Sequence, residues 1–283
     1  MLESVPNFSE GRDAATIEAI GAALGAHARL VDVHADADHN RSVFTLLGSG
    51  PELIEALVDG VRIALERIDL RRHEGAHPRI GAADVIPIVP LASDLQPARS
   101  VALTLGERLG ALGLPVFLYA PPERGPAFYR RGGTAELQRR IDWGEIRPDF
   151  GPRRLDPKAG GVIVGARFPL VAFNVNLRGP LEAAKEIAAV VRESDGGFPG
   201  VRALGLDLPT AGLVQVSMNI EDWPAAPPAA LVEQIRGEAA RRGTEYVGWE
   251  LVGLVPAGAA VGLEGLDPSR VLESHLATDE SAG

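Results

Sequence analysis

The chain has 283 residues, of which 46% are hydrophobic and 23% charged, with no cysteine and a formal net charge of −10. This length suits one large core or two smaller ones, and the composition is that of an ordinary globular protein. The lack of cysteine excludes disulfides, thiolate metal sites and a cysteine nucleophile. The acidic balance argues against a nucleic-acid partner, because phosphate binding requires a basic face.

The chemistry available to the chain is therefore that of imidazole, carboxylate, hydroxyl and amine groups. The N-terminal segment Met1–Asn7 carries neither the basic stretch nor the apolar stretch of a secretory signal, and no later apolar run reaches membrane-spanning length. We expect a cytoplasmic protein.

The first half of the chain alternates between apolar runs typical of strands and apolar residues at helical spacing. Pro51 stands at the favoured first turn of one helix. The pattern predicts a strand at Glu3–Asn7, a helix at Asp13–Gly25, strands at Arg29–Val33 and Ser42–Leu47, a helix from Pro51 and a strand at Asp84–Pro90. A helix at Gln96–Leu112 and strands at Val116–Ala120 and Val162–Ala166 extend this β-α-β-β-α-β unit.

The same order of elements returns from Leu170. The pattern predicts a strand at Leu170–Leu177, a helix at Pro180–Glu193, strands at Val201–Leu208 and Leu213–Ile220, a helix at Ala226–Arg242 and a strand at Tyr246–Val255. The expected fold class is α+β, an α/β sandwich of two tandem ferredoxin-like split β-α-β subdomains, of which the first has an extra helix and extra strands. We place these subdomains at residues 1–178 and 179–266, and expect the tail 267–283 to fray.

The connection Arg71–Asp84 concentrates histidines, arginines and carboxylates between a predicted helix and a predicted strand. Loops of this kind more often carry chemistry than packing. Pro78 restricts His77 to extended backbone, which would hold an imidazole that titrates near neutral pH at a defined position. We interpret His77 as a general base whose ring is oriented, or whose pKa is tuned, by Glu74, Asp84 or His34. The alternative is a solvated loop histidine.

A second polar segment, Asp32–Arg41, alternates imidazoles and carboxylates, so that Asp32, His34, Asp36 and Asp38 would share one face of an extended chain. Such a face suits a metal ion. The segment lacks an HExxH motif, however, and loops between strands commonly collect solvated acidic residues. A metal site is therefore the minor alternative here.

Two further stretches are candidates for ligand binding. The loop Gly151–Gly161 places cations among residues that interrupt regular structure, which in an acidic protein suits a ligand that bears carboxylates. It is no Walker loop, and its arginines are alternatively only solvated. Asn174 and Asn176 lie on one side of a predicted strand, where amides either read the edge of a heterocycle or satisfy buried backbone groups.

Several long motifs, in order, resemble the glutamate formimidoyltransferase family, which includes the formiminotransferase domain of formiminotransferase-cyclodeaminase. The resemblance covers roughly residues 3 to 257. The motifs are Val5-Pro6-Asn7-Phe8-Ser9-Glu10-Gly11, the segment Asp32–Arg41, His77-Pro78-Arg79-Ile80-Gly81-Ala82-Ala83-Asp84, Pro148-Asp149-Phe150-Gly151-Pro152, Gly165-Ala166-Arg167, Ala172-Phe173-Asn174-Val175-Asn176-Leu177, Gln215-Val216-Ser217 and Leu251-Val252-Gly253-Leu254-Val255-Pro256.

The resemblance implies two ferredoxin-like subdomains, a homodimer, and transfer of a formimino group from N-formimino-L-glutamate to tetrahydrofolate, a step of histidine degradation and one-carbon metabolism. By position, the family's catalytic histidine is His77. The folate-binding loop carried over by position is Gly151, Pro152, Arg153, Arg154, Leu155, Asp156, Pro157, Lys158, Ala159 and Gly160. Where animal members of the family have an acidic residue, this chain has His34, so the partner of His77 is not carried over.

The implied reaction requires two proton transfers, which His77 can perform as general acid and base without a metal ion. Arg41 and Arg79 suit bidentate binding of the donor's carboxylates. The expected substrate-binding residues are His34, Arg41, Arg79, Asp84, Asn174 and Asn176. Tetrahydrofolate enters as co-substrate, and we expect no metal ion and no nucleic-acid or membrane partner.

Three alternatives stay open. The first is a glutamate N-formyltransferase that uses 5-formyltetrahydrofolate, because a formyl and a formimino donor present the same glutamate. The second is a mononuclear metal hydrolase that uses His34, Asp36 and His39, with His73 as a further ligand. The third is a non-catalytic binder of folate or glutamyl compounds, in which His77 is only a contact.

Overall fold

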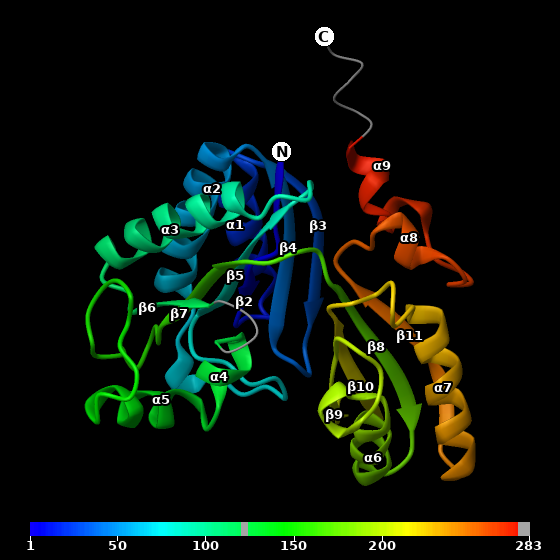
Figure 1. Ribbon diagram of the computed structural model, residues 1–283. Coiled ribbons are helices and arrows are strands. Elements are labelled where there is room, and N and C mark those ends of the chain that lie inside the picture. The colour runs from blue at the N-terminus through cyan, green and yellow to red at the C-terminus, as the bar shows by residue number, and fades with distance from the viewer. Residues whose placement is uncertain (120–123, 277–283) are drawn as a thin grey trace. The chain divides into compact units, whose positions relative to one another are not determined.

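A computed structural model describes residues 1–119 and 124–276. The chain divides into two compact units, unit 1 (Met1–Phe168) and unit 2 (Pro169–Gly283) (Figure 1). This division falls before the strand that precedes the boundary predicted at residue 178, and that strand lies in the interior of the second sheet.

Unit 1 contains the predicted β-α-β-β-α-β order with its extensions. Its elements are β1 (Leu2–Ser4), β2 (Asn7–Phe8), α1 (Ala14–Gly25), β3 (Arg29–Asp36), β4 (Arg41–Gly48), α2 (Gly50–Arg67), the 3-10 helix η1 (Leu70–Arg72), β5 (Ala83–Pro90), α3 (Gln96–Ala111), β6 (Val116–Tyr119), α4 (Pro126–Arg130), α5 (Gly133–Asp142) and β7 (Val162–Ala166). Strands β1 and β2 both lie between β4 and β5, β3 pairs with the outer side of β4, and β5, β7 and β6 run parallel.

The first strand was predicted as one element and is interrupted at Pro6. Proline lacks the N–H that a ladder requires, whereas its carbonyl still accepts a hydrogen bond from Phe44 N at 3.1 Å. Helix α2 begins as predicted near Pro51, where Ser49 and Glu52 form a reciprocal capping box. These two elements thus end or begin where the local chemistry removes or satisfies a backbone donor.

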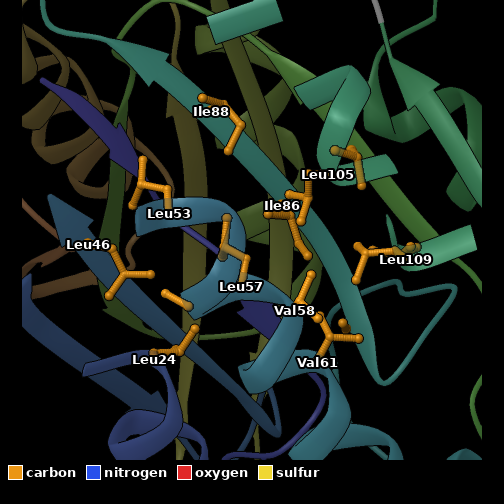
Figure 2. Packing of buried hydrophobic residues seen from close by; sticks show 14 of the residues in the cluster. Leu24, Leu46, Leu53, Leu57, Val58, Val61, Ile86, Ile88, Leu105 and Leu109 are labelled. Atoms are coloured by element: carbon orange, nitrogen blue, oxygen red, sulfur yellow. The ribbon is translucent and has the colours of Figure 1, made fainter. Parts of the chain in front are cut away.

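The main core of unit 1 lies between the sheet and helices α1, α2 and α3. Leu53 and Leu57 of α2 face Leu46 of β4 and Ile86 of β5 in this core (Figure 2). Burying a leucine of this kind contributes roughly 1.5 to 3 kcal/mol. The opposite face carries a smaller cluster, in which Tyr129 of α4 and Leu137 of α5 pack on Phe117 and Ile163. Helix α4 was not predicted, because proline and glycine dominate its surroundings.

Unit 2 repeats the plan in its simplest form. Its elements are β8 (Val171–Arg178), α6 (Leu181–Val191), the 3-10 helix η2 (Glu193–Asp195), β9 (Val201–Leu208), β10 (Leu213–Ile220), α7 (Pro228–Arg241), β11 (Glu245–Val252), α8 (Ala257–Ala260), the 3-10 helix η3 (Pro268–Arg270) and α9 (Leu272–Leu276). The antiparallel sheet has the order β11-β8-β10-β9, with the first strand of the unit in the interior. The predicted fold class, α+β with two split β-α-β units, is confirmed.

The tail that was expected to fray, residues 267–283, is described as far as residue 276. Arg270 donates to the carbonyl oxygens of Leu251 and Gly253 at 3.0 and 2.8 Å, and Glu273 accepts from Ala257 N at 2.8 Å. Hydrogen bonds from polar side chains to backbone groups thus hold this segment in place, although it contains few apolar residues. The rest of the predicted tail, residues 277–283, lies outside the described residues. Among those described, no helix is both long and apolar enough to cross a membrane.

Candidate active site

His77 lies in the connection between η1 and β5, which we call the histidine loop (residues 73–82). Its ring centroid is 6.3 Å from that of His39, with 62° between the ring planes. Burial, followed by the neighbouring charges of Arg41, Arg130 and His39, lowers the pKa of His77 well below its usual value, while a hydrogen bond to the Pro78 backbone acts in the opposite direction. At neutral pH the imidazole is therefore neutral, the form that accepts a proton.

Arg79 fixes the backbone around His77. Its guanidinium donates to the His77 carbonyl oxygen from Nε at 3.1 Å and from Nη2 at 2.6 Å. The same group donates to the carbonyl oxygens of His39 and Asn40 at 3.0 and 3.2 Å. Arg79, which was expected to bind substrate, donates to backbone carbonyls of the histidine loop and of the turn between β3 and β4.

Asn40 connects three segments at the end of that turn. Its backbone is left-handed, with φ of 46°. The side chain accepts from Gly11 N and donates to the Glu74 carbonyl oxygen, both at 2.9 Å. Asparagine tolerates the left-handed region better than most residues, and here its amide also bonds on both sides. No role for Asn40 was predicted from the sequence.

Arg41 and Arg130 supply positive charge next to His77. Burial lowers the pKa of Arg41 to about 10, so that the group stays charged at neutral pH. Arg130 pairs with Asp84, whose other carboxylate oxygen accepts from Ile80 N at 2.7 Å. Within residues 1–119 and 124–276, the Arg41 guanidinium forms no hydrogen bond or ion pair. It is therefore the cation best placed to receive an anion.

Asp84, expected among the substrate-binding residues, pairs with Arg130 and accepts a hydrogen bond from Ile80 N of the histidine loop. Arg130 itself was missed, because a single arginine in a basic segment gives no local signal that it reaches a carboxylate on another strand. His39 was considered only as a metal ligand. Its approach to His77 depends on two loops that meet in space.

The other two histidines of interest have separate surroundings. His73 Nε2 lies 3.0 Å from the Asn40 carbonyl oxygen, and Arg79 Nη1 lies 2.7 Å from His73 Nδ1. Burial and the charge of Arg79 lower the pKa of His73, so its ring is neutral at neutral pH. Its contacts with Asn40 and Arg79 give it a structural role. His34 lies on β3, opposite Val43. Among the described residues, no group of three or more His, Asp or Glu side chains is arranged to hold a metal ion.

The predicted folate loop, Gly151–Gly160, lies directly against the histidine loop. The carbonyl oxygens of Lys158 and Ala159 accept from Leu70 N and Ala82 N, each at 2.9 Å. Gly160 has φ of 70°, and a Cβ atom there would lie 2.0 Å from the Ile80 carbonyl oxygen. This close approach requires glycine.

The cations of that loop fall into two kinds. Lys158 Nζ donates to the Glu66 carbonyl oxygen at 3.1 Å, in the last turn of α2, so its role is partly structural. Arg153 and Arg154 are exposed, and in the described part of the chain their side chains have no ion pair. These two guanidinium groups remain available to an anionic ligand.

Asn174 and Asn176 lie on β8, in unit 2. Asn174 Nδ2 donates to Glu250 Oε2 at 3.2 Å, and Gln215 Nε2 donates to Asn176 Oδ1 at 2.9 Å. The two amides therefore form a polar cluster on one face of the second sheet.

A cavity of about 490 Å³ opens beside His77, a size within the range of small-molecule sites. Histidine-loop residues form most of its wall, and the first turn of α5 completes it. The lining residues are Leu70, His73, Glu74, Gly75, His77, Pro78, Arg79, Gly133 and Thr134.

Both units match models of one enzyme family. Residues 1–167 match the formiminotransferase domain, N-terminal subdomain, and residues 172–263 match the formiminotransferase domain. The two matches together cover most of the chain, so the protein belongs to the formiminotransferase family.

The curated relatives make the family more specific. The chain is 38% identical to glutamate formimidoyltransferase of Streptococcus pyogenes serotype M1 over 98% of both chains. It is 39% identical to glutamate formimidoyltransferase of Thermoplasma acidophilum over 98% of this chain and 97% of the relative. With formimidoyltransferase-cyclodeaminase of Gallus gallus it shares 38% identity over 90% of this chain, which spans 50% of that longer protein.

Proposed function

We propose that the protein is a glutamate formimidoyltransferase that moves the formimino group of N-formimino-L-glutamate to tetrahydrofolate, giving 5-formiminotetrahydrofolate and glutamate. The observation that carries this proposal is the similarity to two glutamate formimidoyltransferases over nearly the full length of all three chains. The neutral imidazole and unpaired guanidinium in unit 1 support it independently, because they are the groups that such a reaction requires.

His77 is the proton-transfer residue of the proposed reaction. A pterin nitrogen attacks the amidine carbon of the donor and gives up its proton to the neutral His77 ring. The tetrahedral intermediate then breaks its bond to the glutamate nitrogen, which takes the proton back from His77. Proton transfer by a positioned imidazole typically contributes ~10²–10⁴-fold to the rate.

Arg41 binds a carboxylate of the donor in this proposal. A charge-assisted hydrogen bond to a guanidinium typically contributes about 1.5 to 3 kcal/mol. Arg130, held by Asp84, adds positive charge near His77. Arg79 acts on the substrate only through the backbone that it fixes. Of these two arginines, Arg41 is therefore the one that contacts the donor's carboxylate directly.

The loop Gly151–Gly160 binds the folate. Its backbone bonds to the histidine loop keep the two loops in register, so that a pterin bound by one would reach the base carried by the other. Exposed Arg153 and Arg154 suit the glutamate carboxylates of folate. A homodimer and a cytoplasmic location, expected from the sequence, stay predictions.

The proposal is tested by measuring turnover of N-formimino-L-glutamate and N-formyl-L-glutamate side by side with tetrahydrofolate. We expect 5-formiminotetrahydrofolate to form from the formimino donor, with the formyl donor turned over much more slowly. Faster turnover of the formyl donor would replace the proposed activity by a glutamate N-formyltransferase. Binding of both substrates without turnover would make the protein a binder.

A further inference from the structure

His39 occupies a buried place in the turn between β3 and β4, where only 1% of its surface is exposed. Its backbone N donates to Asp36 Oδ1 at 2.6 Å, and its carbonyl oxygen accepts from Arg79 Nη2 at 3.0 Å. Its ring Nδ1 lies 3.9 Å from Asp36 Oδ1. The backbone N–H and the carbonyl oxygen of His39 are therefore both hydrogen-bonded, and its ring lies near the Asp36 carboxylate.

The histidine loop lies close against this turn. A Cβ atom at Gly75 would lie 2.3 Å from the His39 carbonyl oxygen, so only glycine permits the approach. Ala76 N donates to the Asp38 carbonyl oxygen at 3.0 Å, which fastens the two segments together. The rings of His39 and His77 meet as a consequence, at the centroid separation and angle of an edge-to-face pair.

We propose that His39 is a positioning residue for His77: anchored by Asp36 and Arg79, its buried ring packs against the His77 ring and holds that ring at the angle from which it serves the substrate. His39 is too deeply buried to touch the substrate itself, so it acts through His77. This inference rests on the proposed function in one respect, namely that His77 is the proton-transfer residue.

The same geometry predicts that the two imidazoles titrate together. His77 faces Arg41 of β4, Arg130 of α4 and His39 of the turn. His39 faces Asp36 of β3 together with Arg79 and His77 of the histidine loop. A proton on the His39 ring opposes a proton on the His77 ring, so the state of one ring affects the other.

The first test uses the unaltered protein. Ring resonances of His39, His77 and His27, assigned through bonds, are followed over pH by nuclear magnetic resonance. We expect the His77 resonances to show the inflection of His39 as well as their own. His27, exposed and 3.1 Å from Asp59, serves as the control outside the histidine loop. A His77 curve that is independent of His39 would overturn the proposal without any variant.

The second test compares two substitutions of His39. His39→Asn removes the ring and is expected to lower kcat about tenfold with KM nearly unchanged, as losses of supporting residues behind an active group typically do. His39→Phe keeps an aromatic ring and should recover most of that loss, whereas His27→Gln should match the parent. Equal kcat for His39→Asn and the parent, or no recovery in a folded His39→Phe, would contradict the proposal.

These tests separate the two proposals. Full turnover by His77→Gln would remove His77 from the proposed chemistry, whereas the coupled titration of the two rings is measured without substrate. The positioning claim fails if that coupling is missing, even when His77→Gln is inactive.

Discussion

The turns between the middle strands of the two units differ although they occupy equivalent places in the fold. In unit 1 the turn ends at Asn40 with φ of 46°, and in unit 2 it ends at Gly212 with φ of 65°. Asn40 bonds to Gly11 and Glu74, whereas Pro209–Gly212 is an exposed turn. Both turns end in a residue with left-handed backbone. In unit 1 the side chain of that residue also forms hydrogen bonds, whereas the glycine in unit 2 has no side chain.

The connections that follow the second long helix of each repeat also differ, and again the one in unit 1 carries the additional contacts. In unit 2, residues 242–244 join α7 to β11, whereas in unit 1 residues 68–82 join α2 to β5 and contain the histidine loop. The longer connection folds back onto the turn between β3 and β4. His77 and Arg79 of the connection thereby lie next to His39 of the turn. The candidate chemistry thus comes from a lengthened loop on a repeated scaffold, and the scaffold alone does not supply it.

Removing the base should have the largest effect. We expect His77→Gln to lower kcat by ~10²-fold or more with little change in KM, because a general base acts on the transition state. The matched control in unit 2 is His275→Gln, since His275 is half-buried and its ring Nε2 lies 2.7 Å from the Ser269 carbonyl oxygen. Steady-state kinetics of both variants decide whether the catalytic histidine is confined to unit 1.

Removing the unpaired guanidinium should weaken donor binding. Arg41→Met is expected to raise the KM for the glutamyl donor roughly 10- to 100-fold, which corresponds to the loss of one charge-assisted contact. Arg178→Met is the control in unit 2, because Arg178 forms an exposed ion pair with Glu245. An unchanged KM in Arg41→Met would assign the donor's carboxylates to another cation.

The first strands of the two units also differ, because β1 buries the carboxyl group of Glu3 whereas β8 contains no carboxyl group. Burial raises the pKa of Glu3 to about 7, against an opposing effect of Arg167. Since the unfolded value is about 4.3, ionisation costs stability as pH rises through this interval. Glu3→Gln should raise the free energy of unfolding by roughly 1 to 3 kcal/mol at pH 8 and hardly at all at pH 4, measured by urea denaturation. A gain that is largest at pH 4 would contradict this sign.

A pair of turn substitutions tests the comparison itself. Asn40→Gly keeps the left-handed backbone and removes two hydrogen bonds, so we expect a loss of about 2 kcal/mol in the free energy of unfolding. Gly212→Asn, the reciprocal change in unit 2, should stay within about 0.5 kcal/mol of the parent, because asparagine tolerates this backbone. Equal effects of the two substitutions would show that the turns are equivalent.

The sequence predicted the scaffold better than the site. Strands β9 and β10 have the predicted bounds, because alternation of apolar residues between turn residues is a local signal. The histidine loop was also found, since its composition is unusual. The partners of Arg79 are backbone carbonyls, and those of Arg130 and His39 come from distant segments. Contacts between distant segments cannot be predicted from the composition of either segment alone.

The pH dependence of kcat/KM tests the central claim, a neutral buried His77 acting as base, most directly. The acid limb of this profile reports the pKa of the free enzyme's base. Burial and the charges of Arg41, Arg130 and His39 hold the pKa of His77 well below its usual value. We therefore expect kcat/KM to stay level as pH falls past about 6.5, the ordinary histidine value, and to decline only below it. An acid limb at or above that value would contradict the assignment.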